Sequence, residues 1–296
     1  MPCECRRNHL ARSPRSFLGV PDDWEAVARR RVLGLVTLQT WRRPDGGLVT
    51  WESRAHRKRD RGSATPSTWW APQALGWWVA ILFVVGSACF AVGPAPGYLA
   101  LVGYRADAIT FFVGSVFFTT AAACQYVETV TAPRGLDDGV ETGRPVLGIE
   151  PGRIDWWASS VQLAGTLFFN ITTFFALRTN LDPKQAHHLI WTPDALGSIC
   201  FLVASELAFA EIGHRLWSWF PHLRSWRITA LNLLGSVAFG VSAIASFILP
   251  TTGEPASVWL TNLGTFVGAI CFLVGAVLLL PERTHPEASF ASAVID

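Results

Sequence analysis

A short phrase recurs six times along this chain of 296 residues: a glycine, a small residue after it, and a phenylalanine four positions after the glycine. Each copy lies in an apolar run of about 20 residues, the length that spans a bilayer as a helix. Small residues on one helical face let helices approach closely in lipid. The phrase therefore predicts six membrane-spanning helices that pack through Gly86 and Phe90, Gly114 and Phe118, Gly165 and Phe169, Gly197 and Phe201, Gly235 and Phe239, and Gly268 and Phe272.

The distribution of basic residues predicts how these helices are oriented. If successive segments between the spans lie on alternate sides of the membrane, 21 of the 24 Lys and Arg lie on the same side as the N-terminus. Fourteen of these come before residue 62. The positive-inside rule places that side in the cytoplasm. We therefore expect a multi-pass protein of the cell membrane with both termini cytoplasmic and with spans at residues 75–94, 108–127, 156–177, 194–213, 228–249 and 259–280.

Two further positions recur with the glycines and indicate that the repeating unit is a pair of helices. Tryptophan stands nine residues before the first glycine of each pair, at Trp77, Trp156 and Trp226. Glutamate stands fourteen residues after the second glycine, at Glu128, Glu211 and Glu282. The expected fold is an all-α membrane domain, residues 72–283, of three antiparallel hairpins at 77–128, 156–211 and 226–282. At a rise of about 1.5 Å per residue, each phenylalanine meets the glycine of the partner helix.

The chain before the first span has a different composition. Residues 1–20 are rich in Arg and Ser and are expected to form a disordered tail. In the cytoplasmic region 21–71, β-branched and aromatic residues flank the turn sequence Pro-Asp-Gly-Gly at 44–47, which predicts a β-hairpin with LVTWESRAHRK as its second strand. We expect residues 22–31 to form a short helix that supports the hairpin, or the hairpin to rest on the membrane. Residues 284–296 are expected to form a cytoplasmic tail.

A basic run precedes the first span and contains Arg54, Arg57, Lys58, Arg59 and Arg61. One interpretation is that it binds the anionic head groups of membrane lipids. The other is that it only fixes the topology of the chain. Since no recognised nucleic-acid-binding fold accompanies the charge, no nucleic-acid partner is expected.

Several polar residues lie inside the predicted spans. Glu206 is an ionisable residue nine positions after Gly197, which places it on the opposite side of that helix. It could serve proton- or cation-linked transport, or it could be a protonated carboxyl that bonds to a neighbouring helix. Gln162, Asn170 and Asn232 predict hydrogen bonds between helices, or else the lining of a solute path.

The three recurrent glutamates, Glu128, Glu211 and Glu282, end their hairpins on the cytoplasmic side. If the hairpins gather about one axis, these carboxylates form a ring of the kind that binds cations in channels. A second interpretation pairs them with basic residues close in sequence, at Arg134, Arg215 and Arg283, as interfacial anchors.

The phrases FVVGSACFAVG, FFVGSVFFTTAA and FVGAICFLVGAVLLLPE resemble the YrhK-like domain, a two-helix membrane module. From about residue 50 to 283, including RIDWW at 153–157, the chain resembles six-span bacterial membrane proteins of actinobacterial type. The resemblance implies kinship of fold through packing motifs and brings no catalytic residues with it.

No P-loop, nucleophile elbow, HExxH helix or dinucleotide fingerprint occurs in the sequence, so neither an enzyme nor a cofactor is expected. The sequence favours a scaffold, sensing or partner-binding role, with self-association into a homo-oligomer left open. The alternative is a transporter or channel for ions or small solutes that uses Glu206 and the glutamate ring. A cavity reaching Glu206 would favour transport, whereas a solid core of Phe and Gly would favour a structural role.

Overall fold

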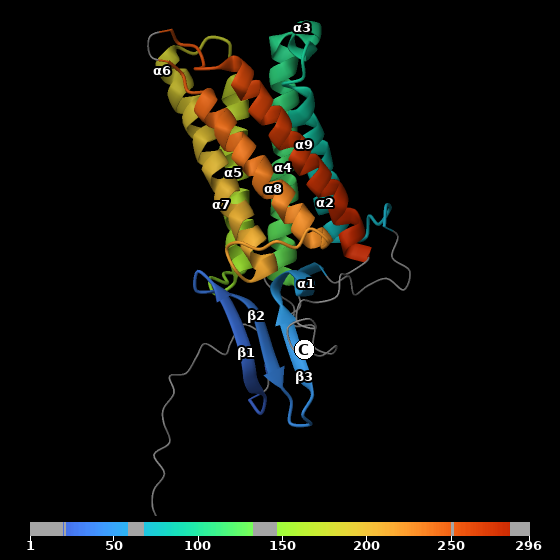
Figure 1. The fold of residues 1–296 in the computed structure, drawn as a ribbon. Helices are drawn as coiled ribbons and strands as arrows, with labels where there is room; N and C mark the ends of the chain where they lie inside the picture. The colour runs from blue at the N-terminus through green and yellow to red at the C-terminus, as the bar shows by residue number, and fades with distance from the viewer. Residues whose placement is uncertain (1–19, 21, 59–67, 133–146, 250–251, 285–296) are drawn as a thin grey trace, which may run out of the picture.

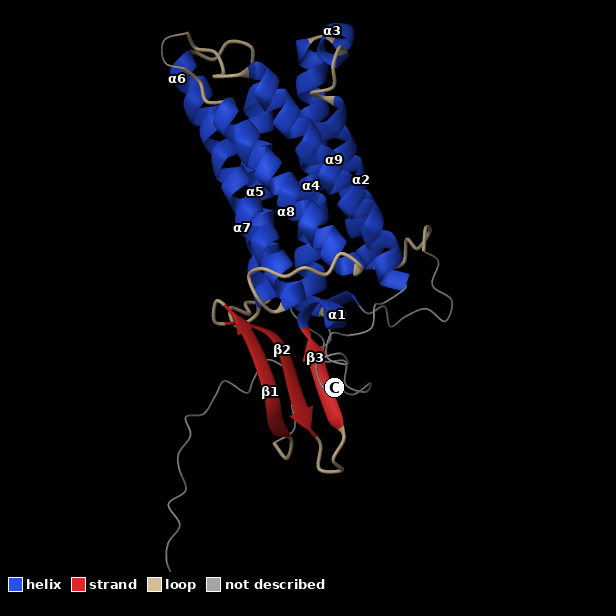
Figure 2. Cartoon of the chain, viewed as in Figure 1, coloured by secondary structure: helices blue, strands red, loops and turns tan. Residues whose placement is uncertain are grey.

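The computed structural model describes residues 20, 22–58, 68–132, 147–249 and 252–284, which form a bundle of long helices above a small antiparallel sheet (Figure 1). The strands are β1 (Glu25–Val32), β2 (Leu35–Arg42) and β3 (Leu48–Glu52). The helices are α1 (Ser53–Lys58), α2 (Leu75–Val92), α3 (Tyr98–Val102), α4 (Tyr104–Thr131), α5 (Ile154–Ala176), α6 (Pro183–Ala186), the π-helical turn η1 (His187–Trp191), α7 (Thr192–Gly213), α8 (Arg224–Ala245) and α9 (Val258–Thr284). Figure 2 shows that helix and strand are segregated along the long axis.

Five helical segments of the described chain are long and apolar enough to cross a membrane, so the protein is a multi-pass membrane protein. They are Leu75–Val92, Tyr104–Thr131, Pro183–Gly213, Arg224–Ala245 and Val258–Glu282. The remaining long helix, α5, has 23 residues but carries Gln162, Asn170 and several hydroxyl side chains. It is therefore less apolar than these five segments and is not counted among them.

The long helices pack in pairs, α2 with α4, α5 with α7 and α8 with α9, and in each pair a phenylalanine fills the space above a glycine. A Cβ atom at Gly86 would lie 2.8 Å from the ring of Phe118, and one at Gly114 would lie 2.9 Å from the ring of Phe90. The corresponding distances are 2.8 Å for Gly165 and Phe201, 3.0 Å for Gly197 and Phe169, 3.0 Å for Gly235 and Phe272, and 2.9 Å for Gly268 and Phe239. A side chain at any of these glycines would therefore displace a ring or the helix that carries it.

Contacts between neighbouring pairs close the six helices into a ring, because α4 packs on α5, α7 on α8 and α9 on α2. Polar side chains join two of these seams. Between α4 and α5, Ser115 and Thr173 lie 2.8 Å apart through their hydroxyl oxygens, and Asn170 donates to Thr119 at 2.7 Å. Between α7 and α8, the hydroxyls of Ser205 and Ser236 lie 2.7 Å apart.

The six phenylalanines of the recurrent phrase meet at the centre of this ring. Phe90, Phe169 and Phe239 form one triangle, with ring centroids 6.1–6.5 Å apart. Phe118, Phe201 and Phe272 form a second triangle, with centroids 5.6–6.2 Å apart. Within each helix pair the two triangles touch at 5.1–5.5 Å. We call these six side chains the phenylalanine core.

The sheet has the order β1-β2-β3 and is antiparallel throughout. The predicted β-hairpin is confirmed as β2 and β3, joined by a turn in which Arg43 N donates to Gly47 O at 2.8 Å. The helix expected at residues 22–31 is wrong, because this segment is β1. Leu33 and Gly34, with φ of 51° and 81°, make the tight turn that pairs β1 with β2. A third strand stabilises a hairpin that would be marginal alone.

The second strand of the predicted hairpin is shorter than expected. It ends at Glu52, and SRAHRK forms α1 instead. The spacing of the basic residues explains the helix. Arg54, Arg57 and Lys58 stand at i, i+3 and i+4, and these positions share one face only in a helix.

We predict that Gly235→Leu lowers the free energy of unfolding by about 1–3 kcal/mol, because the added side chain must displace Phe272 and α9. Gly240→Leu on the same helix is the matched control, since a Cβ there meets nothing within 4 Å. Unfolding in detergent micelles measures both. Equal destabilisation by the two variants would show that the contact with Phe272 does not matter.

Candidate functional site

The helix α1 lies between the sheet and the lower end of the bundle (Figure 1). Each basic residue on its buried face bonds to the glutamate that ends one of the three helix pairs. Arg54 donates from Nε and Nη2 to the two oxygens of Glu282, at 2.8 and 3.0 Å. Arg57 bonds to Glu211 at 3.3 and 3.2 Å, and Lys58 Nζ donates to Glu128 at 2.7 Å. We call these three pairs the α1 clamp.

The Arg57 pair belongs to a larger buried network. Its guanidinium also lies 3.0 Å from Asp155 Oδ2, and Arg153 bonds to both Asp155 and Glu150. The side chains of Arg57, Asp155 and Glu211 are 6%, 0% and 2% exposed. Burial disfavours the charged form of Arg57, but Glu211 and Asp155 outweigh it and raise the pKa of the guanidinium above its ordinary value.

The sheet is joined to the start of α5 by two further contacts. Val36 N donates to Gly152 O at 3.0 Å, and the Arg153 guanidinium lies 5.8 Å from the centre of the buried Trp51 ring. The α1 clamp and these contacts together fix the sheet beneath the bundle.

The first helix of each pair begins in the same way. Trp77, Trp156 and Trp226 donate from the indole N–H to the backbone oxygen eight residues earlier, at 2.9–3.0 Å. The next residue, Trp78, Trp157 or Arg227, donates to the oxygen of a proline six residues earlier. The loops that enter α2, α5 and α8 therefore share one local structure.

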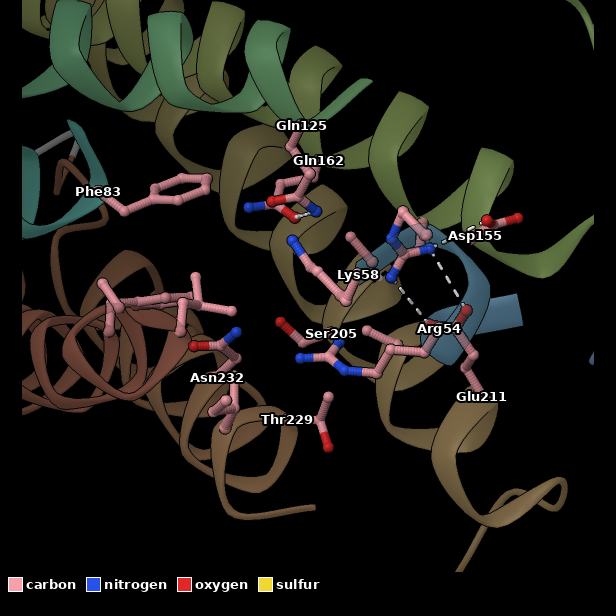
Figure 3. Close-up of a pocket in the computed structure, with 18 residues that line it drawn as sticks. Arg54, Lys58, Phe83, Gln125, Asp155, Gln162, Ser205, Glu211, Thr229 and Asn232 are labelled. Atoms are coloured by element: carbon pink, nitrogen blue, oxygen red, sulfur yellow. Dashed lines mark hydrogen bonds and ion pairs between the residues drawn. The ribbon is translucent and has the colours of Figure 1, made fainter. Parts of the chain in front are cut away.

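A cavity of about 50 Å³ lies between α1 and the phenylalanine core, and we call it the basal cavity. It has room for about three or four water molecules. Figure 3 shows the labelled polar side chains arranged around it, from α1 and from four helices of the bundle. Its lining comprises Arg54, Arg57, Lys58, Phe83, Gln125, Asp155, Ala158, Gln162, Ala204, Ser205, Ala208, Glu211, Ile228, Thr229, Asn232, Phe272, Ala276 and Leu279.

The predicted amides are divided between the cavity and a helix seam. Gln162 lines the basal cavity and accepts a hydrogen bond from Gln125 at 3.3 Å. Asn232 lines it as well, from α8. Asn170 does not line it, because its amide bonds to Thr119 between α4 and α5.

Glu206 lies apart from these residues. It is half-buried on α7 and is not among the lining residues of the basal cavity. In the described ranges it makes no hydrogen bond and no ion pair, so the expected bond to a neighbouring helix is not found.

Glu128, Glu211 and Glu282 come together at one end of the bundle, but their charges are neutralised by α1. Of the expected partners close in sequence, Arg215 makes no ion pair with Glu211 within the described residues, where Arg57 takes that place. Arg134 and the side chain of Arg283 lie outside the described residues. Arg54, Arg57 and Lys58 accordingly face carboxylates of the same chain rather than lipid head groups. The other two residues of that run, Arg59 and Arg61, lie outside the described residues. Within the described ranges, no group of three His, Cys, Asp or Glu is placed to hold a metal ion.

Sequence reasoning missed four polar residues of the basal cavity: Gln125, Asp155, Ser205 and Thr229. A signal existed for Gln125, since it stands three residues before Glu128 and so shares its helical face. The spacing of Arg54, Arg57 and Lys58 was a similar signal for α1. Asp155, Ser205 and Thr229 carry no comparable pattern.

No family model, curated protein or solved structure matches this chain. The features of the molecule that bear on its function are the α1 clamp, the basal cavity and the phenylalanine core.

We predict that Arg57→Met destabilises the protein by about 3 kcal/mol or more, because it leaves Glu211 buried without its counter-charge. Arg42→Met is the control, since its pair with Glu25 is exposed and contributes about 0–1 kcal/mol. Chemical unfolding in detergent measures both. The double variant Arg57→Met, Glu211→Leu should regain most of the loss. A double variant as unstable as the sum of the two single changes would contradict a direct interaction.

Proposed function

We propose that this protein is a non-conducting membrane scaffold that holds its sheet against the cytoplasmic face of the membrane for a protein partner. The observation that carries the proposal is the phenylalanine core, which fills the axis where a transport path would run.

We infer that α5 is a sixth span. Its 23 residues extend about 34 Å as a helix, more than the roughly 30 Å of a hydrocarbon core. Three of its polar residues have partners inside the bundle: Gln162 with Gln125, Asn170 with Thr119 and Thr173 with Ser115. Because these groups bond to protein, their polarity does not oppose insertion into lipid.

We further infer three modules of two helices, consistent with the resemblance to YrhK-like domains. The matched glycine contacts, the matched indole hydrogen bonds and one clamp glutamate in each pair support this inference. Three parallel modules would be related by an axis along the membrane normal, and the phenylalanine core would surround that axis.

Transport, the alternative function, has little support. Between the aromatic rings the space amounts to about 10 Å³ and is lined by Phe90, Ser115, Phe118, Phe169, Phe201 and Phe239. This is too small for more than about one water. The basal cavity ends at Phe83 and Phe272, and Glu206 is not part of it. The glutamates that would have formed a cation ring are already paired.

The sheet offers a face for a partner. Seven of the eight residues of β1 are exposed, and within the described residues β1 pairs only with β2. Such an edge can take an additional extended strand through backbone hydrogen bonds. The exposed Arg30 and Arg31 favour an acidic segment of a partner protein.

The purified protein in liposomes should pass ions and small solutes no faster than empty liposomes, because the phenylalanine core closes the axis. Flux of sodium, potassium, protons and small carboxylates measures this, and an added pore-forming peptide shows that each assay can detect transport. Glu206→Gln should give the same null result. A wild-type flux that Glu206→Gln abolishes would overturn the scaffold proposal in favour of transport.

Topology can be tested at the two ends of the candidate span Pro183–Gly213. In a variant without native cysteines, Lys184→Cys should react with a membrane-impermeant thiol reagent added outside intact cells, and Arg215→Cys should not. Both positions are exposed in the structure, so a difference in labelling reports the side of the membrane rather than burial of the residue. Labelling of Arg215→Cys alone would reverse the assigned orientation.

A further inference from the structure

The basal cavity is closed on the side of the phenylalanine core and polar on the side of α1. Phe83 and Phe272 close it toward the membrane interior, and Arg54, Arg57 and Lys58 form its base. It thus has one apolar end and one charged end, as expected of a small-ligand site whose charged groups fix the ligand orientation.

The charged base retains hydrogen-bond donors that the α1 clamp does not use. Lys58 has three N–H groups and donates one to Glu128. Arg54 donates from Nε and Nη2 to Glu282, which leaves Nη1. The Nε of Arg57 is buried and has no hydrogen-bond partner in the described part of the chain. A buried charged donor that lacks a hydrogen-bond partner destabilises the folded protein, so these donors favour a ligand that accepts hydrogen bonds.

The walls add uncharged donors. The amide of Asn232 makes no hydrogen bond within the described residues, and neither does the Nε2 of Gln162, whose oxygen accepts from Gln125. Ser205 and Thr229 contribute less, because their hydroxyls bond to Ser236 and to the backbone of Ser225. The unpartnered groups of the cavity are therefore mostly N–H donors.

The charged residues of the lining also favour an anion, because cations outnumber carboxylates there. Three cations line the cavity, but only two carboxylates do, those of Asp155 and Glu211. Both are already engaged, Asp155 by Arg57 and Arg153 and Glu211 by Arg57. Glu128 and Glu282 hold their cations without lining the cavity. Each of the three cations is itself paired with a carboxylate, so an anion would be held by the hydrogen-bond donors that these pairs leave unused.

We propose that the basal cavity binds a small monovalent oxyanion of about four non-hydrogen atoms, such as a short-chain carboxylate or nitrate. The cavity volume of about 50 Å³ sets the size, since it corresponds to about three or four waters. The two oxygens of a carboxylate accept from Lys58 and Arg54 at the base, and Asn232 and Gln162 donate from the walls. This binding does not depend on whether the bundle conducts.

Isothermal titration of the full-length protein in detergent, with sodium acetate and sodium nitrate as probes, tests the proposal. We expect saturable binding with one site per chain and none for methylammonium, a cation of similar size. Asn232→Leu should weaken binding about tenfold or more, because it removes a half-buried donor to a charged ligand without touching the α1 clamp. Asn262→Leu, at an exposed position on α9, should leave the affinity unchanged.

Melting temperatures establish that each variant is folded. Lys58→Met should abolish binding, but it also breaks the α1 clamp, so Asn232→Leu is the decisive variant. Wild-type protein that shows no saturable binding would mean that water alone fills the cavity, and the proposal would fail. It would fail equally if methylammonium bound as well as acetate, or if Asn232→Leu bound acetate with wild-type affinity.

Discussion

The contact between a glycine and a phenylalanine of the partner helix determines most of this structure. Helices in lipid gain little by hiding apolar surface, so close packing must hold them together. The contact does more than bring two helices close, because it also fixes their relative height. With the heights fixed, the rings of all three pairs meet in the phenylalanine core. The glutamates fourteen residues beyond the second glycine then reach one level, where the single short helix α1 can bond to all of them.

The sequence predicted those parts of the molecule that repeat and missed those that occur once. Gly86, Phe118 and Glu128 could be placed because equivalent residues occur at the same offsets elsewhere in the chain. β1 could not, since its local sequence resembles a helix and only pairing with β2 makes it a strand. The end of β3 was missed for a related reason. In the sequence Arg54, Arg57 and Lys58 show only their charge, and the carboxylates that they bond to from a helix are 70 to 228 residues away.

The α1 clamp is better understood as a source of specificity than of stability. Taking charges out of water is costly, and a buried pair often recovers no more than that cost. What the pairs do determine is position, because a buried carboxylate without its cation is strongly unfavourable. Arg54, Arg57 and Lys58 meet carboxylates from α9, α7 and α4 at once. A rotation of α1 or a shift by one residue would break all three pairs together.

The same residues connect the basal cavity to the sheet. Arg54, Arg57 and Lys58 line the cavity with one part of their hydrogen-bonding capacity and hold the glutamates with the other. α1 follows β3 without a break, so a ligand that displaced these side chains would act on the element joined directly to the sheet. Since the phenylalanine core closes the other end, a bound anion could act only in that direction. Thermodynamic linkage then requires that anion binding and docking of the sheet affect each other by the same factor. The cavity and the face of the sheet that we propose for a partner would thus be two ends of one coupled unit.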